Sequence, residues 1–245
     1  MIVIRNNYRM LYEKGGYGVG YQIHEGSSFD PDEVRFVLAL LDCRRRFFEP
    51  GVVAIDGGTN IGVHTVEWSS HMHGWGGVGF WLSRHRKSSI SRWPETWRAT
   101  TASTPVLVIP RPTYFAPASF GSLEPRQGES NEFIGQTISY ADSDCDKVRM
   151  LAIDSLQLKR MDLLKIDVEI MELEVLDGAR RTIGTTKPIL VVEAIKTDRG
   201  RLEAYFSSVS YQHFPMGLNL LAIQRDYPTL ERVIVNERGL NLSMS

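Results

Sequence analysis

The sequence has little cysteine, no excess of either charge and no long apolar run. Its two cysteines, Cys43 and Cys145, can build neither a disulfide framework nor a four-ligand zinc site, and no metal is expected. The 28 basic and 29 acidic residues lack the basic excess typical of nucleic-acid binders. No apolar run could span a bilayer, and residues 1–6 do not resemble a signal peptide. These absences predict a cytoplasmic protein with no nucleic-acid partner and no membrane span.

What the sequence does contain is an alternation of strand and helix patterns over 245 residues, enough for one large domain. Apolar runs that predict buried parallel strands lie at residues 52–55, 163–168 and 189–193. Helical patterns lie before, between and after them, at residues 31–46, 63–68, 172–183 and 198–209. Residues 211–215 and 218–223 predict a closing antiparallel hairpin. The pattern predicts an α/β, Rossmann-like, doubly wound and mostly parallel sheet, and the hairpin favours the methyltransferase variant.

The first long helix has clear start and stop signals. Asp30 is the expected cap, Pro31 suits the first helical position, and Glu33 would complete a capping box. Residues 44–46 are three arginines in the last turns. They are either a solvated helix end, which the helix dipole favours, or an anion-binding patch.

A glycine-rich turn follows the first predicted strand. It reads D-x-G-x-x-x-G, from Asp56 through Gly58 to Gly62. Thr59 stands where a dinucleotide site has its middle glycine, which argues against a pyrophosphate ligand. The pattern suits a ligand with a cationic end, such as S-adenosylmethionine, or a tight turn that binds nothing.

Two segments carry a family resemblance. Residues 53–65 resemble the cofactor loop of FkbM-type S-adenosylmethionine-dependent methyltransferases, and residues 162–179 resemble the second signature of that family. The second segment departs from the family at Ile170, where the family usually has glycine. Because a β-branched side chain disfavours positive φ, we expect a distorted turn after Glu169.

The resemblance implies a class I methyltransferase fold and methyl transfer from S-adenosylmethionine to a hydroxyl of a small-molecule, glycan or lipid-like acceptor. It implies two sets of site residues, catalytic Asp167 and Glu169, and cofactor-binding Asp56, Gly58, Thr59, Asn60, Gly62 and His64. The two catalytic candidates could instead cap the next helix, and His64 could be a structural partner. Lys165, inside a predicted strand, is expected to be structural.

Residues 80–105 do not fit this pattern. Glu95 is the only acidic residue between Glu67 and Glu124, so the second strand lacks the carboxylate that would bind a ribose. Reading the same bases one frame on permits a peptide with that acid and a helical pattern. A translation out of frame and a divergent loop both remain open.

The predicted organisation is an N-terminal segment (1–29), a methyltransferase domain (30–226) and a C-terminal tail (227–245). Two other functions remain open, a catalytically impaired methyltransferase-like binding protein and a nicotinamide-dependent oxidoreductase. The oligomeric state stays undetermined.

Overall fold

A computed structural model describes residues 26, 28–48, 51–58, 63–73, 75, 78–83, 106–108, 113–114, 120–123, 138–139, 146–168, 170–237 and 239–243. Of the strands between residues 78 and 150 it describes the backbone alone.

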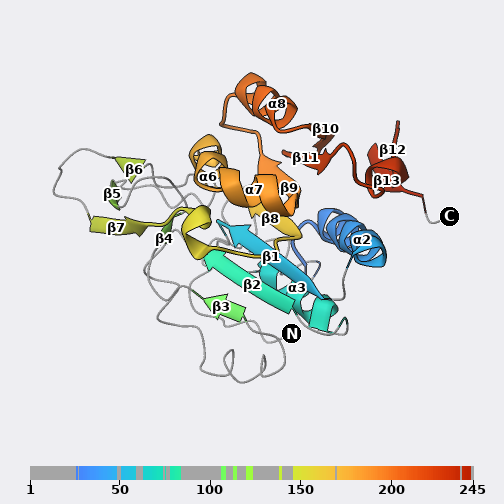
Figure 1. The fold of residues 1–245 in the computed structure, drawn as a ribbon, viewed down its shortest axis with the longest axis horizontal. Helices are drawn as coiled ribbons and strands as arrows, with labels where there is room; N and C mark the ends of the chain where they lie inside the picture. Colours follow the sequence, from blue (N-terminus) through green and yellow to red (C-terminus); the bar gives the residue numbers. More distant parts are fainter. Residues whose placement is uncertain are drawn as a thin grey trace.

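The central feature is a seven-stranded sheet with the strand order β10-β11-β9-β8-β1-β2-β3 (Figure 1). Its strands are β1 (Val52–Gly57), β2 (Val78–Ser83), β3 (Val106–Val108), β8 (Leu163–Ile166), β9 (Ile189–Glu193), β10 (Tyr211–Met216) and β11 (Asn219–Gln224). Five neighbouring strands, from β3 to β9, run parallel, and β11 pairs antiparallel with both β9 and β10. The predicted mostly parallel sheet is therefore confirmed. The order reverses direction between β1 and β8, which is where open α/β sheets bind ligands.

Helices cover both faces of this sheet (Figure 1). They are α2 (Pro31–Phe47), α3 (Val63–His73), α6 (Glu172–Gly178), α7 (Arg180–Thr186) and α8 (Arg199–Ser208), with the 3-10 turns η2 (Ile153–Leu156) and η3 (Leu230–Arg232). Helices α2 and α3 pack on Leu163, Val191 and Leu221 at one face of the sheet. Helices α6 to α8 pack on the opposite face, on the residues that follow the first two of these in the strands, Leu164 and Val192. The alternation of strand side chains thus divides the core into two layers.

A smaller four-stranded sheet has the order β4-β7-β5-β6. Its strands are β4 (Thr113–Tyr114), β5 (Phe120–Leu123), β6 (Ile138–Ser139) and β7 (Asp146–Met150). The segment predicted as a C-terminal tail contains η3 and the hairpin of β12 (Val233–Asn236) and β13 (Gly239–Leu242). Leu240 and Leu242 of that hairpin pack against the core layer of α2.

Two helix predictions need correction. The continuous helix predicted over residues 172–183 is two helices, with a break at Ala179. The carboxylate of Asp154 accepts hydrogen bonds from the backbone N–H of Arg181 (2.9 Å) and of Thr182 (2.7 Å), and so caps a new helix start. Asp30 has a left-handed backbone (φ 45°) and makes no side-chain cap, so the predicted capping box of α2 is absent.

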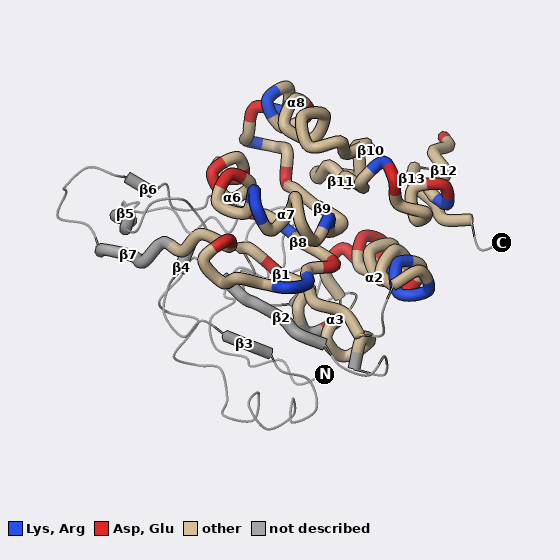
Figure 2. Tube along the Cα trace, in the orientation of Figure 1, with Lys and Arg blue, Asp and Glu red and all other residues tan. Residues whose placement is uncertain are grey.

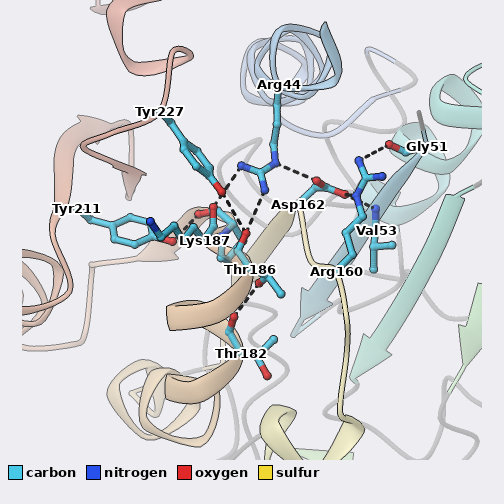
Figure 3. A network of polar contacts seen from close by, with 11 residues as sticks. Arg44, Gly51, Val53, Arg160, Asp162, Thr182, Thr186, Lys187, Tyr211 and Tyr227 are labelled. Atoms are coloured by element: carbon cyan, nitrogen blue, oxygen red, sulfur yellow. Dashed lines mark hydrogen bonds and ion pairs between the residues drawn. The ribbon is translucent and has the colours of Figure 1, made fainter. Parts of the chain in front are cut away.

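Three arginines lie at the end of α2 (Figure 2), and they are not all solvated. Arg45 and Arg46 pair with Asp42 near the surface, but Arg44 is buried and binds Asp162 at 2.9 Å. Arg44 also donates to the carbonyls of Thr186 and Lys187, both at 3.2 Å (Figure 3). The interpretation of Arg44 as a solvated or anion-binding residue is therefore wrong.

Candidate functional site

The carboxyl ends of β1 and β8 contact each other directly. The backbone N–H of Asp167 donates to the carbonyl of Gly57 at 2.8 Å. Gly58 has φ 91°, and a Cβ added there would lie 1.7 Å from the Asp167 carbonyl oxygen. Only glycine fits here, because of the neighbouring backbone. A contact of Gly58 with a cofactor stays a prediction.

Asp56 ends β1 inside this contact. Its side chain is buried (1% exposed), and its Oδ2 accepts a hydrogen bond from Thr65 Oγ1 of α3 at 2.5 Å. Its Oδ1 accepts no hydrogen bond and lies 4.0 Å from Lys165 Nζ. Burial raises the pKa of Asp56, against the opposing effects of Lys165 and the Thr65 hydrogen bond.

Lys165 is the buried cation of this edge. Its Nζ donates to Asp167 Oδ2 at 3.1 Å. Burial disfavours its charge, but Asp167, Asp56 and Glu33 together outweigh burial and raise the pKa of Lys165 above its ordinary value. A buried ammonium requires such partners, so a lysine inside an apolar strand was itself a signal that carboxylates converge here. Its expected structural role thus extends into the site.

Asp167 stands at the border of the buried cluster, because its side chain remains 41% exposed while its Oδ2 binds Lys165. Glu33 comes from the first turn of α2, and its Oε2 accepts from Asn219 Nδ2 at 2.6 Å. Burial raises the pKa of Glu33 to about 7, although Lys165 opposes the shift. In the sequence Glu33 stands in a capping-box pattern, which gave no sign that its side chain lies near Lys165.

His64 is buried in the first turn of α3. Its ring stacks between Phe29 and Trp68, with centroid distances of 5.1 and 5.4 Å. Its Nε2 lies 3.2 Å from the carbonyl of Phe29, and burial lowers its pKa to about 3. A neutral ring that donates to Phe29 anchors the start of α2, and a contact of His64 with a cofactor stays a prediction.

The turn after β8 carries the expected departure from the family. Ile170 has φ 77° and is exposed, so the chain keeps the left-handed conformation with a β-branched residue in it. Glu172 closes the turn, because its Oε1 accepts from the backbone N–H of Val168 at 3.3 Å and its Oε2 accepts from Thr197.

The remaining predicted site residues, Thr59, Asn60, Gly62 and Glu169, lie outside the described residues. So does the segment 84–105. The strand before it is described: β2 pairs with β1 in register and ends at Ser83, opposite Gly57. The strand has no acidic residue at its end, where a ribose-binding carboxylate was expected.

Two kinds of feature are absent from the part of the chain that the structure describes. None of its helices combines the length and apolar character needed to cross a bilayer. None of its groups of histidine, cysteine, aspartate and glutamate is arranged to hold a metal ion.

The strand order and the polar edge at the switch point are consistent with a methyltransferase fold. The sequence matches the methyltransferase FkbM domain over residues 56–213, more than half of the chain. The chain therefore belongs to the FkbM methyltransferase family.

The structure is similar to the crystal structure of a methyltransferase FkbM from Methylobacillus flagellatus KT. The TM-score is 0.50 at 18% sequence identity, and the match covers 76% of this chain and 47% of that one. At this identity the likeness concerns the fold alone, and the present chain spans about half the length of that protein. No curated protein matches the sequence significantly.

Proposed function

We propose that this chain is an S-adenosylmethionine-dependent methyltransferase that acts on a hydroxyl group. The observation that carries the proposal is the charge cluster at the switch point, where Asp56 and Asp167 flank Lys165. The buried Oδ1 of Asp56, which accepts no hydrogen bond, suits a ligand that brings a cationic group.

The residues fit the amino-acid end of S-adenosylmethionine, which carries an ammonium beside the sulfonium. Asp56 and the glycine-rich segment that continues through Thr59, Asn60 and Gly62 would hold that end. The ribose end is less well provided for, because β2 ends at Ser83 without an acid. We expect a weakened cofactor affinity for this reason, by about 1.5–3 kcal/mol for one lost charge-assisted hydrogen bond.

The bound cofactor would supply an electrophilic methyl group on a positively charged sulfur. Lys165 holds Asp167 in place, and the exposed part of the Asp167 carboxylate is available to orient an acceptor hydroxyl and to take its proton. Glu169, two residues further on, is the second candidate for this role. Sugar, polyketide and lipid-like hydroxyls are the acceptor classes that we propose.

Calorimetric titration separates this function from its alternatives. The protein should bind S-adenosylmethionine and S-adenosylhomocysteine and should not bind NADH. Binding of NADH alone would favour an oxidoreductase, and binding of S-adenosylmethionine without transfer to any acceptor would favour the impaired binding protein.

Transfer of labelled methyl to a panel of hydroxyl acceptors then tests the residues. Asp167→Asn should lower turnover about 10²–10⁴-fold, as expected for loss of an acid–base group. Asp177→Asn is the matched control, because Asp177 is exposed on α6 and pairs only loosely with Arg180 at 3.8 Å. Near-normal turnover of Asp167→Asn would remove Asp167 from the mechanism.

A further inference from the structure

Glu33 reaches the same edge of the sheet from a different element. Its partner Asn219 begins β11 and is paired with Glu193, the last residue of β9. The carboxyl end of β9 lies at the same edge as the ends of β1 and β8, since the three strands are parallel. Glu33 therefore extends the cluster of Asp56, Lys165 and Asp167 toward β11.

The charges around Glu33 come from several elements. Lys165 of β8 attracts a negative charge on Glu33, whereas Asp167 after β8 and Asp30 before α2 repel it. Asp56 of β1 faces the same ammonium. Three carboxylates, Glu33, Asp56 and Asp167, thus share one lysine, and together they exceed its charge by two.

Unsatisfied oxygens accompany this excess. Glu33 Oε1 and Asp56 Oδ1 are both buried, and neither accepts a hydrogen bond. Burial is the main reason that the pKa of Glu33 rises to about 7, so this carboxyl is about half protonated at neutral pH. A proton on Glu33 brings the three carboxylates closer to balance with Lys165.

We propose that Glu33 is partly protonated in the ligand-free protein at neutral pH and releases this proton to solvent when a cationic methyl donor binds at this edge. The ionised Glu33 then joins Asp56 and Asp167 in balancing the sulfonium and ammonium charges of S-adenosylmethionine. This inference rests on the proposed function. It makes Glu33 a positioning residue that acts through the shared field of the cluster.

The inference predicts a particular pH dependence of affinity. As the pH increases toward 7, the affinity for S-adenosylmethionine should increase about tenfold per pH unit. Above about pH 7 it should level off, because Glu33 is already ionised there. S-adenosylhomocysteine lacks the sulfonium charge, so its affinity should depend less steeply on pH.

Titration calorimetry at pH 7 in two buffers of different ionisation enthalpy, phosphate and Tris, measures the proton directly. The wild type should release about half a proton per S-adenosylmethionine. Glu33→Gln should release none, and its carbonyl oxygen can still accept from Asn219. Glu203→Gln, an exposed glutamate on α8 paired with Arg199, is the matched control and should behave as wild type.

Equal apparent enthalpies in the two buffers, or proton release that survives in Glu33→Gln, would overturn the inference and leave the proposed function standing. Absence of any binding by the wild type would overturn both. If Glu33→Gln does not fold, carbon-13 NMR of the wild-type carboxyls decides. The Glu33 signal should titrate near pH 7 without ligand and below pH 6 with S-adenosylmethionine, and an unchanged titration contradicts the inference.

Discussion

The parallel strands of the central sheet all begin at one side of the sheet, called here the amino edge, and end at the opposite side, the carboxyl edge. The two edges satisfy their buried charges in different ways. At the amino edge, Asp162 accepts from Arg44, from Arg160 and from the backbone N–H of Val53, at 2.7–2.9 Å (Figure 3). The Arg44 guanidinium also lies over the rings of Phe48 and Tyr227, at 4.6 and 4.7 Å. The carboxyl edge instead keeps buried oxygens on Asp56 and Glu33 that accept no hydrogen bond.

The two arrangements suit different roles. A buried ion pair with all its hydrogen bonds made fixes how α2, β8 and the end of α7 meet, and it offers nothing to a ligand. Buried oxygens that accept no hydrogen bond lower the stability of the fold. A protein keeps such oxygens where a bound ligand supplies the missing hydrogen-bond partner or charge. We therefore expect the amino edge to stabilise the fold and the carboxyl edge to bind the ligand, and each of the following experiments tests this division.

The largest effect is expected at the amino edge. Arg44→Met should lower the free energy of unfolding by about 3–5 kcal/mol, because Asp162 keeps a buried charge without its main partner. Arg46→Met is the control: Arg46 is 55% exposed and pairs with Asp42 one turn away, so its loss should cost only about 0.5 kcal/mol. Urea unfolding of both variants measures the difference, and similar losses in the two would show that the amino edge is not the stabilising one.

Gly58→Ala should be the next most damaging change, and it acts where the two carboxyl ends touch. The new Cβ would overlap the Asp167 carbonyl and would also sit at positive φ, so we expect a loss of roughly 2–5 kcal/mol. Gly217→Ala is matched, because Gly217 also has positive φ (59°) but no heavy atom within 4 Å of the new Cβ. Thermal unfolding should place the Gly217 variant well above the Gly58 variant, and equal melting temperatures would mean that contact with Asp167 does not matter.

Much of the sheet could be predicted because its signals are local. Buried parallel strands are continuous apolar runs, and β1, β8 and β9 were predicted within one or two residues of their observed ends. The break between α6 and α7 could not be predicted in this way, because its cause is Asp154, about 27 residues earlier in the chain. Arg44 was misread for the same reason, because its partner Asp162 is 118 residues away.

The candidate site follows the same rule. Asp56, Gly58 and Asp167 were predicted from motifs, and the structure brings them together at one edge. Glu33 was missed because its partner Asn219 is 186 residues away, and a glutamate in a first helical turn is ordinarily a cap. Charge clusters depend on topology, which periodicity alone does not provide.

The pH dependence of stability tests the carboxyl edge without a ligand. The pKa of Glu33 is raised in the folded state, so the folded protein holds this proton more tightly than the unfolded chain does. Glu33 therefore costs no stability below about pH 4.5, and its cost grows as the pH rises toward 7 and reaches on the order of 3 kcal/mol above it.

Glu33→Gln should remove that cost, so the variant should be more stable than wild type at pH 8 and similar to it at pH 4.5. Urea unfolding across this pH range is the measurement, with Glu203→Gln as the exposed control. If the unfolding free energy of Glu33→Gln changes with pH as that of the wild type does, Glu33 is not the group that lowers stability at this edge.

The smallest expected effect concerns Ile170, which the sequence already marked as a departure from the family. A left-handed conformation costs an L-residue about 1–2 kcal/mol, and glycine avoids this cost but gains freedom in the unfolded chain. Ile170→Gly should therefore stabilise the protein by about 0.5–1 kcal/mol. Ile195→Gly is the control, because Ile195 is similarly exposed (52% against 54%) and has no positive φ, so glycine there should destabilise. If the two changes in unfolding free energy have opposite signs, the backbone is strained at Ile170, next to the proposed acid–base residues, and strain is often kept at functional sites. Equal losses of stability in the two variants would mean that the turn accommodates isoleucine without strain.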